Sequence, residues 1–230
     1  MKTHRFKEKL KGIVTAISVA VLFSSFAYAR ILNSAKILSV YQSFYFLVSN
    51  EDVSVSTSLH TAYLNGGAGY LLERAGEDYS VYACYLSLSE AESAKKNITD
   101  KKQSAEIYEE RVTQIYLKSK KQKICERAIK GYIQTLYSCI SLIGRYTVSC
   151  EKGGYTQTEL YDLLQDLFRV LERLAKENTS TVFKKASDGI VQSVEECRRR
   201  INELIYAKDL RFFGAELADL YLSFLSNFKL

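Results

Sequence analysis

EKGGYTQTELYDLLQDLFRVLERL, residues 151–174, is the stretch on which the expected fold depends. Gly153 and Gly154 suit the end of one helix, because a helix C-terminus commonly needs a residue in the left-handed conformation. Thr156 and Glu159 then form a Thr-x-x-Glu capping box, which indicates the start of a second helix. Apolar residues follow at the spacing of one helix face: Leu160, Leu163, Leu164, Leu167, Val170, Leu171 and Leu174.

Helical periodicity continues on both sides of this stretch. After the polar run 178–180, apolar residues recur at helical spacing over 183–204 and again over 209–227. On the other side, the stretch from a candidate cap at residues 99–100 to the glycine turn carries an apolar helical pattern over 107–143. One unbroken helix of about 50 residues would reach about 75 Å, so we expect a bend at the lysine-rich run 118–123. Three further segments are predicted as helices, namely 31–48, 58–75 and 78–92. In the second of these, Gly66, Gly67 and Gly69 either allow close packing against a neighbour or mark a loop.

Proline is absent from the chain, where an average usage of about 5% would give roughly a dozen. No predicted helix therefore loses a backbone donor to proline. The sequence predicts an all-α fold, a bundle of six or seven helices. The alternative is a short array of helical-hairpin repeats, because residues 69–91 (GYLLERAGEDYSVYACYLSLSEA) resemble one tetratricopeptide hairpin over about a tenth of the chain. No second copy follows at a period of about 34 residues.

The first 29 residues are predicted to be a cleavable secretory signal peptide. Residues 2–11 carry five basic residues against one acid, residues 12–29 (GIVTAISVAVLFSSFAYA) carry no charge, and Ala27 and Ala29 form a small-x-small site. These are the three parts of a secretory signal. Cleavage would leave Arg30 as the first residue of a single helical domain, residues 30–230. The alternative is an uncleaved membrane anchor, which needs roughly 20 apolar residues.

Removing this segment also removes most of the net charge. The whole chain carries a formal charge of +6, of which the segment before Arg30 supplies four units, so the remainder is close to neutral. A nucleic-acid-binding domain needs a basic face of its own. We therefore expect no nucleic-acid partner, and membrane contact only through the N-terminal segment if it is not cleaved.

Five cysteines lie in the expected mature domain, and an oxidising compartment would allow up to two disulfides with one thiol left over. Cys125 and Cys139 share a predicted helix, where 14 residues separate them by about 21 Å, and disulfide α-carbons lie within about 7 Å. Cys84 or Cys197 is therefore expected to pair with a central cysteine. The alternative is buried free thiols that pack as small apolar residues. The candidate cysteines are Cys84, Cys125, Cys139, Cys150 and Cys197.

The sequence contains no recognisable catalytic, metal or cofactor motif. His60 is the one histidine after Arg30, so a Ser-His-Asp or Cys-His mechanism would depend on it. Its place near the start of a predicted helix favours a surface or capping role instead. Gly66–Gly69 lacks the Lys-Ser/Thr of a phosphate loop, and Arg198–Arg200 lie beside glutamates that can pair with them on a solvated face. We expect no enzyme, no catalytic residue, no cofactor and no metal.

The expected function is that of an exported protein, periplasmic or extracellular, that binds another protein without catalysis. Such a protein would show a contiguous exposed apolar or tyrosine-rich patch. One alternative is a binding protein for a small apolar ligand, with a closed apolar pocket of roughly 300 Å³ or more. The other is an enzyme centred on His60. Glycosylation sequons at Asn97 and Asn178 matter only if the source is eukaryotic.

Overall fold

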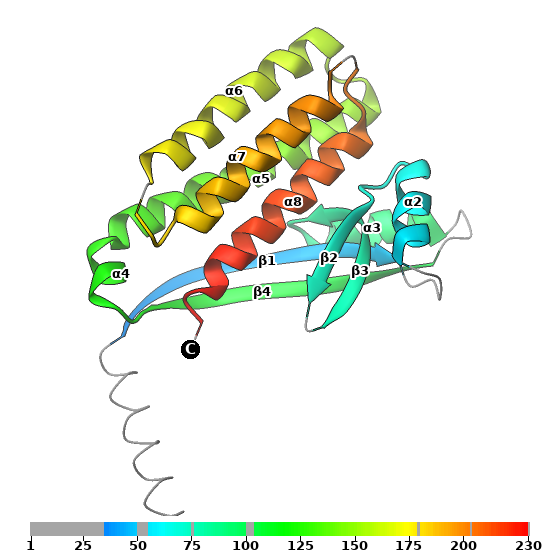
Figure 1. Ribbon diagram of the computed structural model, residues 1–230. Helices are drawn as coiled ribbons and strands as arrows, with labels where there is room; N and C mark the ends of the chain where they lie inside the picture. The colour runs from blue at the N-terminus through cyan, green and yellow to red at the C-terminus, as the bar shows by residue number, and fades with distance from the viewer. Residues whose placement is uncertain are drawn as a thin grey trace, which may run out of the picture.

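The structure is a computed structural model that describes residues 35–49, 55–74, 76–99, 104–178, 180–202 and 204–229. The expected signal peptide and its cleavage residues Ala27, Ala29 and Arg30 lie outside the described residues. In chain order the elements are β1 (Lys36–Ser49), α2 (Val55–Leu64), β2 (Tyr70–Arg74), β3 (Glu77–Tyr85), α3 (Leu88–Thr99), β4 (Ala105–Leu117), α4 (Lys120–Ile124), α5 (Glu126–Lys152), α6 (Gln157–Glu177), α7 (Lys184–Arg200) and α8 (Ala207–Ser226) (Figure 1).

The prediction of an all-α bundle is wrong, because the first half of the described chain contains a four-stranded antiparallel sheet. Its strand order is β2-β3-β1-β4. Since α2 connects β1 to β2 and α3 connects β3 to β4, this is the split βαβ arrangement of ferredoxin-like units. β1 and β4 form the longest pair, from Lys36 opposite Leu117 to Ser49 opposite Ala105.

Residues 36–49 form a strand because their side chains suit one. β-branched and aromatic residues make up half of this strand, and these pack well on a pleated surface. Phe46 and Val48 belong to the core on one face of the sheet, while Leu47 belongs to the core on the other face. A strand buried on both faces shows a continuous apolar run, which periodicity alone does not distinguish from a buried helix. The absence of proline is equally compatible with paired strands, where proline would remove a ladder hydrogen bond.

Over residues 58–74 the chain forms most of α2, a loop and β2, so the prediction of one helix over 58–75 is wrong. Between α2 and β2, Gly66 and Gly69 adopt positive φ angles of 84° and 60°. Gly67 approaches β3 so closely that a Cβ atom there would lie 2.7 Å from the ring of Tyr82. These glycines therefore both form the loop and allow α2 to pack on β3.

The hairpin-repeat alternative is also wrong. Residues 69–91, which resemble a helical hairpin in sequence, form the strand hairpin of β2 and β3 followed by the first turn of α3. The predicted helices at 78–92 and 107–117 are likewise mostly strand, in β3 and β4.

The helices expected around the glycine turn are confirmed. α5 ends in Gly153, which has a left-handed φ of 66°. The Thr156 hydroxyl accepts a hydrogen bond from the Glu159 amide, and the Glu159 carboxylate accepts one from the Thr156 amide at 2.8 Å. The lysine-rich run 118–123 forms the predicted turn, since it contains the short helix α4 between β4 and α5.

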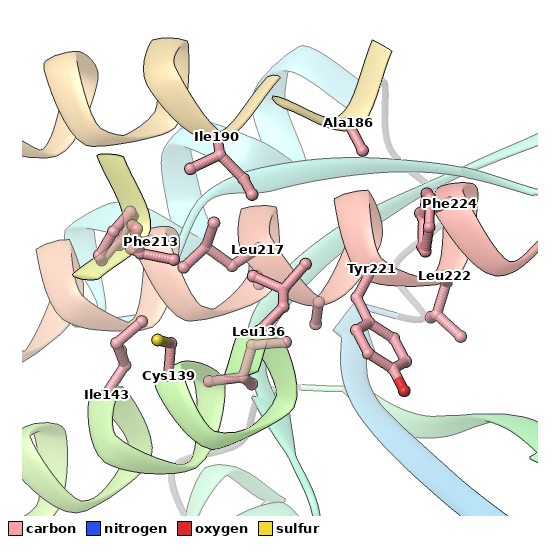
Figure 2. Close-up of a cluster of buried hydrophobic side chains, with 14 of the residues drawn as sticks. Leu136, Cys139, Ile143, Ala186, Ile190, Phe213, Leu217, Tyr221, Leu222 and Phe224 are labelled. Carbon is pink, nitrogen blue, oxygen red and sulfur yellow. The ribbon is translucent and has the colours of Figure 1, made fainter. Parts of the chain in front are cut away.

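α8 joins the helices to the sheet (Figure 1). Figure 2 shows its apolar side chains between α5 and α7: Leu136, Cys139 and Ile143 from α5, Ala186 and Ile190 from α7, and Phe213, Leu217 and Tyr221 from α8. The ring of Tyr221 also contacts Phe44 of β1, with 5.2 Å between ring centroids. One core therefore extends from the helical bundle into the sheet.

α2 and α3 cover the opposite face of the sheet over a smaller core. That core contains Leu47, Ala62, Tyr82 and Ala105. In Figure 1 these two helices lie at the end of the sheet where β1 finishes and β4 begins, so the other end of the β1–β4 ribbon extends beyond them. The sheet thus lies between two helical layers of unequal size.

Candidate functional site

A charged network connects the sheet to α8. Arg74, the last residue of β2, forms ion pairs with Glu110 of β4 and with Asp219 of α8, the latter at 2.5 Å. The hydroxyl of Tyr70 donates to the second carboxylate oxygen of Asp219 at 2.7 Å. These four residues line a cavity of about 490 Å³ together with Leu71, Leu220 and Leu222. The network brings three charged side chains that are each 14–22% exposed into direct contact, and it is the first candidate for chemistry.

The groups in this network are bonded to one another, which limits what they can do. The guanidinium of Arg74 donates to two carboxylates, so its charge is neutralised locally. Burial and the nearby Asp219 carboxylate raise the pKa of the Tyr70 hydroxyl far above its usual range, so it remains a proton donor. Burial likewise raises the pKa of the neighbouring Cys84 thiol, which disfavours the nucleophilic thiolate. The arrangement is suited to holding three elements together.

Two further polar residues of α8 contact the first half of the chain. Asp209 is 2% exposed and accepts a hydrogen bond of 3.5 Å from the hydroxyl of Tyr63 on α2. Arg211 donates to the carbonyl of Gly66 in the α2–β2 loop and pairs with Glu151 at the end of α5. The α8–sheet interface is therefore fixed by directional polar contacts as well as by apolar packing.

A second candidate is an apolar groove of about 360 Å³ between α5 and α6, open to solvent on one side. On α5 its lining extends from residue 134 to residue 146, a length of about 18 Å at 1.5 Å per residue. The lining side chains are Gln134, Thr135, Ser138, Cys139, Leu142 and Tyr146 from α5, and Leu163, Asp166, Leu167 and Val170 from α6.

The sequence explains why this groove is not filled. The α5 wall contains small side chains, and a Cβ atom at Gly131, one turn before Thr135, would meet nothing within 4 Å. The predicted apolar stripe of α6 is wider than the surface that its neighbours cover. Leu163 is consequently half-buried and Val170 is 44% exposed. Both belong to the predicted apolar face of this helix, and both line the groove.

The predicted disulfides are wrong, because all five cysteines are free thiols. Cys139 and Cys197 are buried in the core of the bundle. The thiol of Cys150 donates to the carbonyl of Ile205 at 3.5 Å. Burial raises the pKa of Cys139 to about 11, so its thiol is protonated at neutral pH. These residues act as small apolar side chains. Cys84 in β3 and Cys125 between α4 and α5 are half-buried.

The remaining predicted site residues do not form a catalytic cluster. His60 is exposed on α2, and no described carboxylate is hydrogen-bonded or ion-paired to it. In the arginine run, Arg199 and Arg200 pair locally with Glu196 as expected, whereas Arg198 pairs with Glu172 of α6. Arg199 is exposed, but Arg198 and Arg200 are only partly exposed, so the run is not wholly a solvated face. Of the sequons, Asn97 is exposed, whereas the amide of Asn178 donates to the carbonyl of Leu174.

The described ranges contain neither a metal-binding cluster of side chains nor a helix that could span a membrane. In those ranges, no group of three or more His, Cys, Asp or Glu residues is placed to hold a metal ion. No helix among the described residues has both the length and the apolarity that crossing a bilayer requires.

Comparison with protein-family models, with curated proteins and with solved structures gives no match for this chain. The inference of function therefore depends on the geometry of the two candidate sites. The charged network is internally satisfied, and the α5–α6 groove presents apolar side chains to solvent.

Proposed function

We propose that this protein is a non-catalytic binding protein that acts outside the cytoplasm and accepts an amphipathic helix of a partner protein in the α5–α6 groove. The observation that carries the proposal is the open apolar lining between these two helices. Apolar surface of this kind, bordered by polar side chains, is characteristic of helix-in-groove recognition, in which anchors at i, i+3 or i+4, and i+7 enter the groove.

The dimensions of the groove favour a helix. Its length of about 18 Å along α5 corresponds to about three turns of a partner helix. Gln134 and Ser138 on α5 and Asp166 on α6 supply polar groups among the lining residues. A small apolar ligand is the less suitable occupant, because pockets for such ligands bury roughly 70–90% of the ligand surface, and this groove is open on one side.

The proposal that the protein does not catalyse a reaction is supported by the state of its buried polar groups. Arg74, Glu110, Asp219 and Tyr70 are bonded to one another. The proposal that it acts outside the cytoplasm is supported by the sequence of residues 1–29 alone. Mass spectrometry of the N-terminus of the cell-produced protein tests it, since a chain beginning at Arg30 is expected and a cytoplasmic chain beginning at Met1 would contradict it.

The groove is tested by photocrosslinking in the source cells with the full chain. A photoreactive amino acid at the exposed position Ser138 in the groove is expected to give a protein adduct, and one at the exposed position Gln192 on α7 is not. Val170→Glu should abolish the adduct, because it places a charge in the apolar lining.

Val191→Glu is the matched control, since Val170 and Val191 are 44% and 40% exposed. Equal adducts from positions 138 and 192 would contradict the groove as the site. Adducts of lipid or of another small apolar molecule, lost in Val170→Glu, would replace the partner helix with a small ligand.

A further inference from the structure

The basic residues of this protein are concentrated at one end of the molecule. The start of β1, the segment from the end of β4 to the start of α5, the α6–α7 connection and the C-terminus carry eleven basic side chains against two acids, Glu126 and Glu177. We call this surface the basic end. Its members are Lys36, Lys118, Lys120, Lys121, Lys123, Arg127, Lys130, Lys176, Lys184, Lys185 and Lys229.

Contacts between these segments show that they lie together. Lys36 pairs with Glu126 at 2.5 Å, which joins the start of β1 to the start of α5. The ammonium of Lys118 donates to the carbonyl of Lys229 at 2.5 Å, and that of Lys121 donates to the hydroxyl of Thr181 at 2.7 Å. In Figure 1 the start of β1, the end of β4, α4 and the α6–α7 connection share one end of the molecule.

Exposed apolar side chains lie among these lysines. Ile124, at the end of α4, is 75% exposed, the largest value for a large apolar side chain in the described part of the chain. Ile37 in β1 is 51% exposed and pairs across the ribbon with Tyr116. A solvated lysine face alone would not explain exposed isoleucines at the same place, whereas an interfacial surface combines both kinds of side chain.

We infer that the basic end is a docking surface for a lipid bilayer with anionic headgroups. Lysines near such a surface are attracted to it, and Ile37 and Ile124 can enter its interfacial region. Residues 30–230 are nearly neutral in total, and the basic end is positively charged. The rest of the described molecule therefore carries net negative charge, and the anionic bilayer repels it. The bilayer would thereby orient the protein with its basic end inward.

Two observations favour a bilayer over a nucleic acid. Ten of the eleven basic residues are lysine, whereas bidentate recognition of phosphates and bases favours arginine. The uncharged run 12–29 also precedes Lys36 by only a few residues, so the chain enters the described structure at the basic end. Whether that run is cleaved or retained, the part of the described structure that follows it in the chain is the basic end.

The test uses tryptophan fluorescence, because the chain contains no tryptophan. Ile124→Trp in the full chain, in whichever N-terminal form the cells produce, is mixed with vesicles of equal parts phosphatidylglycerol and phosphatidylcholine. We expect a shift of emission to shorter wavelength that is absent with pure phosphatidylcholine and is suppressed by high salt. Leu64→Trp on α2 is the matched control, since Leu64 is 68% exposed, and its emission should not change.

The contribution of charge is tested in the same assay. Lys120→Gln with Lys184→Gln should weaken partitioning by about 25-fold, at about fivefold per lysine near an anionic surface. Lys96→Gln with Lys152→Gln, on α3 and at the far end of α5, should leave partitioning unchanged.

Three results would overturn the inference. The first is the absence of an emission shift with anionic vesicles, and the second is an equal shift for Leu64→Trp. The third is binding to duplex DNA that is tighter than binding to the vesicles and equally sensitive to the Lys120 and Lys184 substitutions. The last result would assign the basic end to nucleic acid.

Discussion

Tyr41 is strained at the level of its own backbone. In the described chain it is the one non-glycine residue with a positive φ, 50°, and its side chain is 73% exposed. It lies where the pairing of β1 with β4 shifts register, between Ser39 and Gln42. A side chain in the left-handed region costs about 1–2 kcal/mol, and an exposed ring recovers little of this through burial.

Replacement of Tyr41 by glycine should therefore relieve strain. We expect Tyr41→Gly to be more stable than Tyr41→Ala by about 0.5–1 kcal/mol. Glycine relieves the backbone strain, but it also gives the unfolded chain more conformational entropy, and the expected value is the difference between these two effects. Alanine is the control because it removes the ring and retains Cβ. Urea unfolding of both variants measures the difference, and an alanine variant as stable as the glycine variant would show that the backbone at this register shift is unstrained.

Glu216 is a carboxyl group of α8 that is largely removed from water. One of its oxygens, Oε2, has no hydrogen-bond partner in the described chain. Burial raises the pKa of this group. Ser193 and Arg200 of α7 oppose the rise, and Glu196 of α7 and Asp219 of α8 increase it. The folded protein therefore holds this proton more tightly than the unfolded chain does.

This raised pKa predicts a loss of stability as the pH increases. Glu216 contributes to the free energy of unfolding in full when the pH is below the ordinary carboxyl pKa. This contribution is lost as the pH rises from that value through the raised pKa of the folded state. Glu216→Gln should remove that part of the pH dependence and stabilise the protein at pH 7, by on the order of 1 kcal/mol. Urea unfolding from pH 4 to pH 8 measures this. The exposed Glu195→Gln is the control, and parallel pH profiles for Glu216→Gln and the unmodified protein would refute the assignment.

At the scale of the element, α6 shows how far local signals reach. Its capping box involves only residues 156 and 159, and both reciprocal hydrogen bonds form. Thr156→Ala removes the hydroxyl that accepts the Glu159 amide, so we expect a loss of about 1 kcal/mol. Thr158→Ala, in the first turn of the same helix and exposed, should change stability by less than about 0.5 kcal/mol. Thermal unfolding of the two variants makes the comparison, and similar losses would contradict a specific cap.

At the scale of the whole molecule, the Arg74 network fixes the sheet to the helical bundle. Arg74→Ala would leave Glu110 and Asp219, whose side chains are 14% and 22% exposed, without their cation. We expect the free energy of unfolding to fall by about 2–4 kcal/mol. This lies near the range for a broken buried ion pair, and it is lowered because the side chains are partly exposed. Arg111→Ala is the matched control, because the Arg111–Glu109 pair is 62% and 39% exposed, and exposed pairs contribute at most about 1 kcal/mol.

Urea unfolding followed by circular dichroism measures both arginine variants. The double variant Arg74→Ala with Asp219→Asn should recover part of the loss, since it removes one of the two stranded charges. Equal losses for Arg74→Ala and Arg111→Ala would show that the network does not join the two halves.

What the sequence determined by itself is local. The glycine turn at 153–154, the capping box and the amphipathic faces of α6, α7 and α8 all depend on residues within a few positions of one another, and each forms as predicted. The sequence also determines part of the α5–α6 groove. Leu163 and Val170 belong to an apolar stripe of α6 that is wider than one neighbouring helix can cover.

Only the tertiary structure decided the rest, because it depends on partners distant in sequence. β1 is buried on two faces by elements that follow it, which removes the alternation that would have identified a strand. Arg74 meets carboxylates 36 and 145 residues away, and the cysteines are held apart by packing that spacing does not reveal. The near-neutral total charge of residues 30–230 also concealed how unevenly that charge is distributed, since folding gathers lysines from four parts of the chain at one end of the molecule.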